Sequence, residues 1–338
     1  MEIVVPCGGK SSRFPNLRPK YLLTDYSGNL MIQRVVKQYL DVASVTVVIL
    51  EEHDQEYGVV AKFREIFGKS VKVHALPAPT CGPAETVYAA LDDMEAKSPL
   101  LVRDSDSFFN HEMVEGNNIF VANLHDYPDL SSVSQKSFTL SNDQDVVLNL
   151  VEKRVVSENF CVGGYQFASI LDYKLAFERV TRKRGYVEVF VSHVIDSMIS
   201  NDVFFKQTQV SDYIDVGTSR EWFDFNDRPT FLCDIDGVIL KSKFSYDEEV
   251  EPIWENVTVM LEKESYGCKL VFVTSRPEIN RDKTIAALSN LGFRDFELVM
   301  GLNHSSRVLI NDFAPSNPFP SARAINIVRD SASLRDYI

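Results

Sequence analysis

Short apolar runs alternate with longer segments of helical period in the first part of the chain. The runs Ile3–Val5, Val45–Leu50 and Val71–Ala75 are rich in β-branched residues, as expected of buried strands. Between them, the segments 31–40 and 57–67 repeat their apolar residues at helical spacing. This alternation predicts βαβ units and a mostly parallel sheet.

The pattern changes further along the chain. A predicted helix over 84–96 leads to a predicted buried strand over 100–102. From about 119 to 167, paired strands joined by polar turns indicate an inserted antiparallel portion. A helix over 187–199 and a strand over 203–208 follow. Ligands of such sheets collect at the carboxyl ends of strands, so the residues after the first and fourth predicted strands are the first candidates for chemistry.

A polar, proline-containing segment at 223–229 stands directly before a new apolar strand, Phe231–Cys233. A chain of 338 residues is long enough for two separate cores. We therefore expect two domains, 1–225 and 229–338.

Composition and charge narrow the possible partners. The formal net charge is -13 and no basic stripe is visible, which argues against binding to nucleic acid or to an anionic membrane. No stretch of about 18 apolar residues suggests a membrane span, and no signal peptide is recognisable. The five cysteines are scattered without CxxC spacing, which predicts reduced thiols and a cytoplasmic protein.

The first predicted strand opens into a loop of small residues that ends in a cation, Cys7-Gly8-Gly9-Lys10-Ser11-Ser12-Arg13-Phe14. Glycines let the backbone approach a triphosphate closely, and N–H groups and hydroxyls bind its oxygens. Arg13 would neutralise charge. The loop predicts a phosphate cradle formed by Gly8, Gly9, Ser11 and Ser12, although a tight βα turn beside an unrelated arginine is the alternative.

A proline-lysine pair, Pro19-Lys20, follows this loop. Together the loop and the pair resemble the signature of the sugar-phosphate nucleotidyltransferases. The resemblance implies that Arg13 and Lys20 contact the phosphates of a nucleoside triphosphate and stabilise the leaving pyrophosphate. Ser11 stands where many members of that family carry glycine.

Further pieces resembling this family follow in its order, across residues 1 to about 223. Gly82-Pro83-Ala84-Glu85-Thr86 resembles the segment that closes over the base and ribose, which implies nucleotide-binding roles for Gly82, Glu85 and Thr86. Asp104-Ser105-Asp106 follows a predicted strand at the place of the family's metal-binding aspartate. Asp106 rather than Asp104 is the expected Mg²⁺ ligand.

The acceptor side of the same family is also represented. Glu152-Lys153 and Gly163-Gly164-Tyr165 resemble its acceptor-binding pieces, which implies that Glu152, Lys153 and Gly164 contact the phosphorylated substrate. Asp215-Val216-Gly217-Thr218 resembles the turn of its second metal-binding aspartate, Asp215. Glu188, near the start of a predicted helix, is either part of the sugar pocket or a surface charge.

Two carboxylates, Asp234 and Asp236, end the apolar strand that opens the second predicted domain. The motif resembles that of the haloacid-dehalogenase-like phosphatases, which implies that Asp234 is the nucleophile and Asp236 the acid/base. A carboxylate attacks a phosphoryl group to form an acyl phosphate, while a partner protonates the leaving oxygen and then activates water.

Two later strands complete this resemblance. Val271–Val273 leads to Thr274 and Ser275, and the hydroxyl of Thr274 or of its neighbour Ser275 would bind the phosphoryl oxygens. Val308–Ile310 predicts a buried strand before Asp312, which would hold Mg²⁺ together with Asp234.

The lysine that steadies the phosphorylated aspartate in that family has no clear counterpart. We favour Arg307 as its substitute, and Lys283 is the alternative. Few residues, Leu240 to Asp247 and a short stretch, separate the first motif from the next helix, so no large cap is expected.

The predicted fold class is α/β: a GT-A/Rossmann-like nucleotidyltransferase domain with a mixed sheet, then a small haloacid-dehalogenase-like domain. The predicted function is bifunctional. One domain joins a nucleoside monophosphate to a phosphorylated sugar or polyol, the other hydrolyses a phosphomonoester, and both use Mg²⁺. The segments Ser11–Phe14, Pro83–Thr86 and 310–327 resemble capsular polysaccharide biosynthesis proteins.

Two alternatives stay open. The second domain is either a phosphatase or a non-catalytic binding or oligomerisation module. The first domain is either a nucleotidyltransferase or a glycosyltransferase that uses a ready-made nucleotide sugar, but a glycosyltransferase has less use for Arg13 and Lys20. No residue pattern specifies the base, the acceptor or an oligomeric state.

Overall fold

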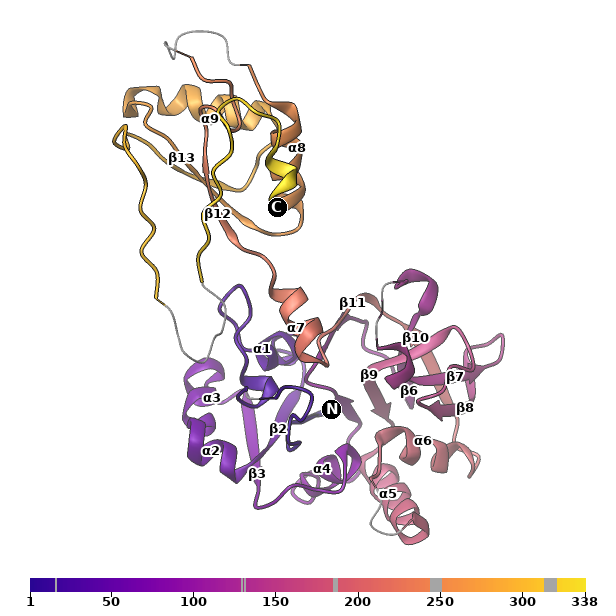
Figure 1. Cartoon of the computed structure of the whole chain (residues 1–338). Coiled ribbons are helices and arrows are strands. Elements are labelled where there is room, and N and C mark those ends of the chain that lie inside the picture. Colours follow the sequence, from indigo (N-terminus) through magenta and orange to yellow (C-terminus); the bar gives the residue numbers. More distant parts are fainter. Residues whose placement is uncertain (16, 129, 131, 185–187, 244–250, 313–320) are drawn as a thin grey trace. The chain divides into compact units, whose positions relative to one another are not determined.

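The chain folds into two compact units. The computed structural model describes residues 1–15, 17–128, 130, 132–184, 188–243, 251–312 and 321–338 (Figure 1). Unit 1 comprises Met1–Asn226 and unit 2 comprises Asp227–Ile338. The division falls inside the polar segment 223–229.

Unit 1 is built on a nine-stranded sheet with the strand order β3-β2-β1-β4-β9-β6-β10-β8-β7. The strands β1 to β4 are parallel, whereas β9 runs antiparallel to both β4 and β6. The predicted parallel and antiparallel portions therefore belong to one mixed sheet. Its strands are β1 (Glu2–Pro6), β2 (Ser44–Leu50), β3 (Val71–Leu76), β4 (Leu100–Arg103), β6 (Asn118–Asn123), β7 (Ser137–Ser141), β8 (Val146–Glu152), β9 (Asn159–Phe167) and β10 (Phe205–Gln209).

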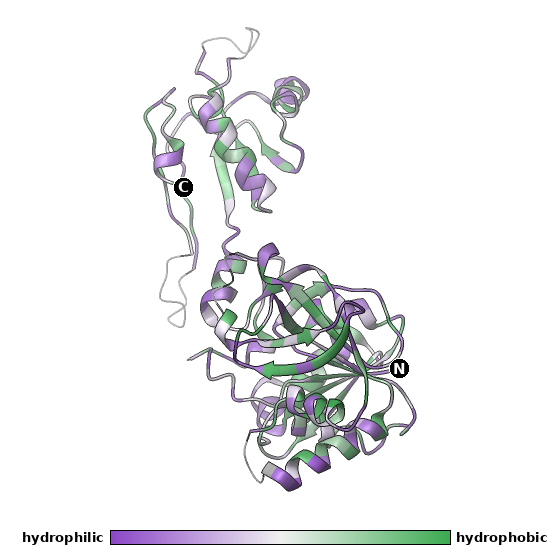
Figure 2. Cartoon of the chain, turned by 90° about the vertical axis from the view of Figure 1, so that its right-hand side faces the viewer, coloured by the Kyte–Doolittle hydropathy of each residue, from purple (hydrophilic) through white to green (hydrophobic). Residues whose placement is uncertain are grey.

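Helices cover both faces of this sheet. Ile3 and Val5 of β1 pack with α1 (Met31–Val36) and α3 (Val59–Phe67), whereas Val4 packs with the helices of the other face. Alternate residues of a strand point to opposite faces, so a strand that is covered on both sides is apolar throughout. Figure 2 shows the strands of unit 1 mostly in hydrophobic colours and its helices with hydrophilic stretches. The helices of the second face are α4 (Pro83–Ala89), α5 (Ile170–Arg184) and α6 (Val191–Ile199).

Two smaller elements bring the later part of unit 1 to the carboxyl end of β4. The strands β5 (Ser107–Asn110) and β11 (Ser211–Asp215) form a separate antiparallel pair in which Asp215 lies opposite Ser107. The helix α7 (Ser219–Asn226) then ends the unit.

Several predicted helix boundaries were wrong. The segment 57–67 is interrupted at Gly58, whose φ of 61° separates α2 (Glu51–Tyr57) from α3. A left-handed residue ends one helix and begins the next, which a periodicity argument alone does not detect. The predicted helix over 84–96 ends at Ala89, and α5 was not predicted.

Unit 2 contains a three-stranded parallel sheet in the order β12-β13-β14. Its core includes Ile235, Phe272 and Leu288. In the register of β12 and β13, Asp234 lies opposite Val273, so the residues that follow these two strands are neighbours. The elements are β12 (Thr230–Asp234), α8 (Trp254–Ser265), β13 (Lys269–Val273), α9 (Arg281–Asn290) and β14 (Phe296–Val299).

The predicted buried strand over 308–310 is wrong. These residues are irregular, and Val308 and Ile310 are 80% and 88% exposed. A short apolar run becomes a strand only when a sheet edge pairs with it, and the described strands of unit 2 pair only with one another. Parts of two sequence predictions lie outside the described residues: 244–247 of the region without a large cap, and 313–320 of the segment that resembles capsule proteins.

No helix in the described parts of the chain combines the length and apolar character that crossing a membrane requires.

Asn256 ties three segments of unit 2 together. This buried residue of α8 donates to the carbonyls of Val238 and Ser331, at 2.8 Å each, and accepts from the Leu334 N–H at 3.1 Å. Asn256→Ala would leave the buried Leu334 N–H without a partner, which costs about 1–3 kcal/mol, whereas the two partly buried carbonyls can still bind water and cost less. We predict a loss of roughly 2–4 kcal/mol in the free energy of unfolding of unit 2.

Urea unfolding followed by Trp254 fluorescence, in a protein with Trp222→Phe in unit 1, measures this loss. Thr258→Ala is the control, because Thr258 is an exposed residue of the same helix whose hydroxyl only donates to the Trp254 carbonyl. Equal effects of the two substitutions would show that the Asn256 bonds do not hold unit 2 together.

Candidate functional site

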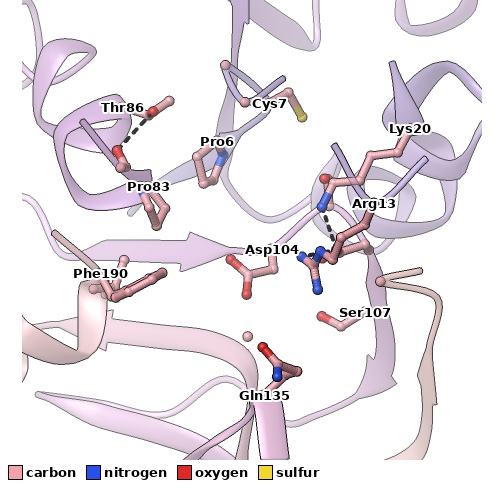
Figure 3. A pocket seen from close by; sticks show the side chains of 18 of the residues that line it. Pro6, Cys7, Arg13, Lys20, Pro83, Thr86, Asp104, Ser107, Gln135 and Phe190 are labelled. Carbon is pink, nitrogen blue, oxygen red and sulfur yellow. Dashed lines mark hydrogen bonds and ion pairs between the residues drawn. The ribbon is translucent and has the colours of Figure 1, made fainter. Parts of the chain in front are cut away.

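A cavity of about 830 Å³ opens at the carboxyl ends of β1 and β4 in unit 1. Its walls come from the loop after β1, the start of α4, the β4–β5 turn, the strands β7 to β9 and the residues before α6. In Figure 3, Asp104 stands in the middle, with Arg13 and Lys20 on one side and Phe190 on the other. The predicted residues that line the cavity are Gly8, Gly9, Ser11, Ser12, Arg13, Lys20, Gly82, Thr86, Asp104, Asp106, Glu152, Lys153, Glu188 and Asp215.

Two hydrogen bonds of Ser11 hold the loop after β1 in its conformation. Ser11 has a φ of 48°, which side-chain-bearing residues rarely adopt. Two bonds hold it there: its carbonyl accepts from the Phe14 N–H at 2.8 Å, and its hydroxyl accepts from the Lys20 N–H at 3.2 Å. A Cβ atom added at Gly9 would have no neighbouring atom within 4 Å. At Gly9 the main chain therefore borders open space, as a phosphate cradle requires, whereas Gly8 is packed against Leu76 and Thr86.

Two carboxylates, Asp106 and Asp215, converge beside this loop. Asp106 follows β4 and Asp215 ends β11, and the pairing of β5 with β11 brings them together. A Cβ placed on Gly217 would lie 3.1 Å from Asp215 Oδ1 and 3.3 Å from Asp106 Oδ2. Both carboxylates can therefore reach one common point in space.

Each of these carboxylates is paired with a lysine. The Lys20 ammonium donates to Asp106, and the Arg13 guanidinium lies 3.7 Å from the same carboxylate. Lys136 Nζ lies 2.5 Å from Asp215 Oδ2, which also accepts from the Ser132 hydroxyl at 2.5 Å. Cations thus already neutralise the two groups that the sequence assigned to a metal.

The third carboxylate, Asp104, has a raised pKa, whereas the pKa of Asp106 is lowered. Burial and the negative charge of Asp106 raise the pKa of Asp104, and Lys20, Arg103 and Lys136 only partly offset them. Burial would also raise the pKa of Asp106, but Lys20 and Arg13 outweigh it and hold that pKa below its usual range. Asp106 therefore keeps its negative charge to a lower pH than Asp104 does.

Asp106 and Asp215 fit a Mg²⁺ site. Magnesium is usually held by one or two carboxylates, with water and substrate phosphates as its other ligands. The described residues contain no group of three or more histidine, cysteine or acidic side chains that could hold a metal without a substrate. An ion held by Asp106 and Asp215 would take its other ligands from water or from phosphate oxygens.

A second region of the cavity presents hydroxyl and carboxylate groups. Glu152 Oε2 accepts from the hydroxyls of Ser137 and Ser192, at 2.5 and 2.6 Å. Lys153 has a φ of 53°, and its ammonium lies 4.3 Å from the centre of the Phe190 ring. Such an environment can bind the hydroxyl groups of a polar acceptor.

Two glycines show how closely the walls approach each other. Gly163 has a φ of 82°, and a Cβ there would lie 2.5 Å from Asp104 Oδ2. Gly82, with a φ of 152°, precedes α4, and a Cβ there would lie 2.6 Å from the Val189 carbonyl. Both positions require glycine, because a side chain would collide with the opposite wall and strain the backbone.

Two predicted binding residues do not line the cavity. Gly164 belongs to the core, because a Cβ there would lie 2.8 Å from Phe109 and 2.9 Å from Phe120. Alternation along β9 turns its neighbour Gly163 to the cavity instead. Glu85 is also absent from the lining, and its carboxylate accepts from the Cys81 N–H at 2.5 Å, so it holds the turn before α4.

Unit 2 carries its own group of charged side chains at the ends of β12 and β13. The Arg307 guanidinium lies 3.3 Å from Asp234 Oδ1. Asp236 accepts from the Thr274 hydroxyl at 3.2 Å and from two nitrogens of Arg276, Nε at 2.9 Å and Nη2 at 2.7 Å. Burial raises the pKa of Asp234, and Arg307 acts against that rise.

The strand that was expected to carry Asp312 to the metal site of unit 2 is absent from the described residues. Asp312 follows the irregular segment 308–310 and is exposed, and its carbonyl accepts from the Ser321 hydroxyl. The contacts of the Asp234 carboxylate come from Ile235 and Arg307. Without a strand at 308–310, nothing directs Asp312 to the end of β12, so this arrangement does not fit an Asp234–Asp312 magnesium site.

Two further predicted residues of unit 2 are Ser275 and Lys283. The Ser275 hydroxyl donates to the Asn303 carbonyl at 3.4 Å, and Lys283 is an exposed residue of α9. Of the two cations considered, Arg307 is the one in contact with Asp234.

Sequence reasoning missed several residues that the structure places in these sites. In unit 1 they are Lys136, Ser137, Phe190 and Ser192, which line the cavity but carry no motif. In unit 2, Arg276 was quoted with its motif and given no role, although its position directly after Thr274 and Ser275 was a usable signal.

Comparisons with known proteins agree with this geometry. Residues 3–116 match the sequence model of the MobA-like NTP transferase domain. No curated protein matches the chain at the sequence level.

Similar solved structures are known. They include the nucleoside-diphosphate-sugar pyrophosphorylase of Vibrio cholerae RC9, with 20% identity, a TM-score of 0.56 and coverage of 66% of this chain and 98% of that one. The inositol-1-phosphate CTP transferase of T. maritima has 14% identity and a TM-score of 0.53, covering 65% and 90%. A UDP-glucose pyrophosphorylase complexed with UDP-glucose has 13% identity and a TM-score of 0.52, covering 67% and 97%.

At these identities the likeness shows the fold. The predicted nucleotidyltransferase fold is therefore confirmed for the N-terminal part of the chain. The likeness of unit 2 to haloacid-dehalogenase-like phosphatases stays a prediction.

The raised pKa of Asp104 predicts a pH-dependent effect on stability. A carboxyl with a higher pKa in the folded state than in the unfolded state stabilises the fold below its unfolded pKa. That contribution is lost as the pH rises through the folded pKa. Asp104→Asn, which resembles the protonated form, should therefore raise the free energy of unfolding at pH 7.5 by about 1–3 kcal/mol and have little effect at pH 4.

Urea unfolding without added metal at the two pH values measures this difference. Asp143→Asn, in an exposed turn, is the control. A destabilisation by Asp104→Asn at pH 7.5 would contradict the assignment.

Proposed function

We propose that unit 1 transfers a nucleoside monophosphate from a nucleoside triphosphate to a phosphorylated sugar or polyol. The observation that carries this proposal is the convergence of Asp106 and Asp215 between a phosphate-binding loop and a region of acceptor-binding groups. The solved structures of similar fold include proteins named for such reactions.

The proposed reaction is a displacement at the α-phosphorus. A phosphate oxygen of the acceptor forms a new bond to that phosphorus, and the bond to the oxygen that bridges to the β-phosphate breaks. Pyrophosphate leaves with that oxygen. Bound Mg²⁺ would neutralise charge on the triphosphate, held by Asp106 and Asp215.

The side chains of unit 1 would position the two substrates and balance their charge. Arg13 and Lys20 lie on the side of Asp106, where they would stabilise the negative charge that develops on pyrophosphate. The loop N–H groups from Gly8 to Ser12 would bind the triphosphate oxygens. Glu152 would accept hydrogen bonds from the hydroxyl groups of the sugar or polyol, in exchange for those of Ser137 or Ser192.

We further propose that unit 2 hydrolyses a phosphomonoester. An oxygen of Asp234 would attack the phosphorus, the ester bond would break, and Asp236 would protonate the leaving oxygen. Water would then release phosphate from the acyl phosphate, with Asp236 accepting its proton. The contact between Arg307 and Asp234 supports this proposal, because a cation beside the nucleophile favours its ionised form.

One observation favours a second function for unit 2. Asp236 is held by two nitrogens of Arg276, whose side chain is 8% exposed. Arg276 and the Thr274 hydroxyl together occupy both oxygens of Asp236, whereas a proton donor needs one oxygen directed to the leaving group. A non-catalytic binding module is therefore the alternative. With either function, we propose that the enzyme acts in the synthesis of a surface-polysaccharide precursor, a proposal that rests on the sequence resemblance to capsule proteins.

The first activity prediction concerns pyrophosphate release. Asp106→Ala and Lys20→Ala should each lower its rate by about 100-fold or more, because each removes a group that handles triphosphate charge. The assay tests four nucleoside triphosphates against a panel of sugar and polyol phosphates, with pyrophosphate and phosphate measured separately.

Arg34→Lys is the control, because it alters an ion pair of unit 1 outside the cavity. Arg34 pairs with Asp25 and does not line the cavity. Near-normal turnover in both Asp106→Ala and Lys20→Ala would refute the assignment of the site.

The second activity prediction concerns phosphate release. Asp234→Asn should abolish it and leave pyrophosphate release largely intact, because the two sets of residues lie in different units. Arg307→Ala should move the acidic limb of the pH profile for phosphate release to higher pH. The reason is that Arg307 lowers the pKa of Asp234, and the nucleophile must be ionised.

Lys283→Ala on α9 is the matched control for the loss of a cation. If the wild-type protein releases no phosphate from any sugar, polyol or bisphosphate substrate and traps no beryllium fluoride at Asp234, unit 2 is the binding module.

A further inference from the structure

Lys136 makes a buried ion pair inside the cavity, and no sequence motif predicted this pair. Its ammonium lies 2.5 Å from Asp215 Oδ2, and the two side chains are only 16% and 6% exposed. Lysine is seldom buried, and a buried ion pair gains little stability over apolar packing because both charges lose water. The position of Lys136 therefore suggests a use beyond holding the fold together.

The main chain around Lys136 belongs to the acceptor side of the cavity. Lys136 stands just before β7, and its carbonyl accepts from the Lys153 N–H at 3.0 Å. The next residue, Ser137, donates to Glu152. Lys136 thus links the Glu152–Lys153 turn to the carboxylate of Asp215.

The cations of the cavity contact different carboxylates. In Figure 3, Arg13 and Lys20 lie beside Asp104 on one side, and Gln135, the residue before Lys136, lies below it. Arg13 and Lys20 contact Asp106, whereas Lys136 contacts Asp215. The charge of Lys136 still reaches the other carboxylates, since it lowers the pKa values of Asp104 and Asp106.

An acceptor phosphate needs such a cation. It carries up to two negative charges and has to approach both the α-phosphate and the carboxylates, which repel it. Arg13 and Lys20 are placed for the triphosphate. Lys153 is directed to the Phe190 ring, 4.3 Å away.

We propose that the Lys136 ammonium binds the phosphate group of the acceptor, exchanging Asp215 for a phosphate oxygen when both substrates are present. The inference rests on the proposed nucleotidyl transfer. Lys136 keeps its proton throughout, while the acceptor oxygen forms its bond to the α-phosphorus and pyrophosphate leaves. It lowers the repulsion between the two substrates and so acts on the affinity for the acceptor.

The test uses Lys136→Met and Lys136→Arg in the full chain. With the triphosphate and acceptor that give turnover in the wild-type protein, Lys136→Met should raise the KM for the acceptor by about 10- to 100-fold, the usual effect of losing a charged hydrogen bond. The KM for the triphosphate should change by less than about 3-fold, a factor typical of a site without that contact. Lys136→Arg, which retains the charge, should recover part of the acceptor affinity.

A binding measurement gives a readout without turnover. The same acceptor phosphate is titrated calorimetrically into protein saturated with Mg²⁺ and the α,β-methylene analogue of the triphosphate, which cannot release pyrophosphate. Its dissociation constant should rise in Lys136→Met as the KM does. Lys174→Met is the matched control, because Lys174 forms a similar lysine–aspartate pair, 2.7 Å from Asp92 Oδ1, and does not line the cavity.

The outcomes separate this inference from the proposed function. If Lys136→Met lowers thermal stability or triphosphate affinity and leaves acceptor affinity unchanged, Lys136 is only the counterion of Asp215 and the inference is wrong. If Lys136→Met does not fold, loss of acceptor affinity in Lys136→Arg, with triphosphate affinity retained, supports it, and unchanged affinity overturns it. If the wild-type protein shows no pyrophosphate release with any substrate pair, the proposed function fails and the inference fails with it.

Discussion

The site of unit 1 depends on holding several carboxylates close together in a partly buried place. Asp104, Asp106 and Asp215 meet there because β4 ends beside the β5–β11 pair. Like charges at such distances repel strongly, so the fold requires positive charge around them. Lys20, Arg13 and Lys136 supply it from the cavity side. Arg103, which is fully buried, also supplies positive charge. Its guanidinium donates to the Tyr39 hydroxyl, the Ser107 carbonyl and the Gly163 carbonyl.

This balance between carboxylates and cations also bears on how the cavity would hold the two proposed substrates. A metal ion and a triphosphate would together replace the lysine contacts of Asp106 and Asp215, which frees two cations for phosphate groups. The cation of the Asp106 side comes from the loop region after β1, and that of the Asp215 side stands before β7. Asp106 and Lys20 thus come from the parallel portion of unit 1, whereas Asp215 comes from the separate β5–β11 pair and Lys136 from the residue before β7.

In unit 2, arginines rather than lysines pair with the two carboxylates. Asp234 contacts Arg307, and Asp236 contacts Arg276 through two nitrogens. Arg307 lies beside Asp234, the proposed nucleophile, and acts against the rise that burial causes in the pKa of that carboxyl. The acid/base role proposed for Asp236 requires that Arg276 release one of its oxygens in the presence of substrate.

The sequence by itself determined the strands of the parallel portion, the loop from Gly8 to Arg13 and the acidic residues at the strand ends. These features are local, because periodicity and residue type within a few positions specify them. Only the tertiary structure decided that Lys136 meets Asp215, that Gly163 rather than Gly164 faces the cavity, and that 308–310 is exposed. Such contacts join residues far apart in sequence, as Lys20 and Asp106 are, 86 positions apart. Which distant segments pair depends on the burial of whole strands and helices, a property of the assembled core that no single motif contains.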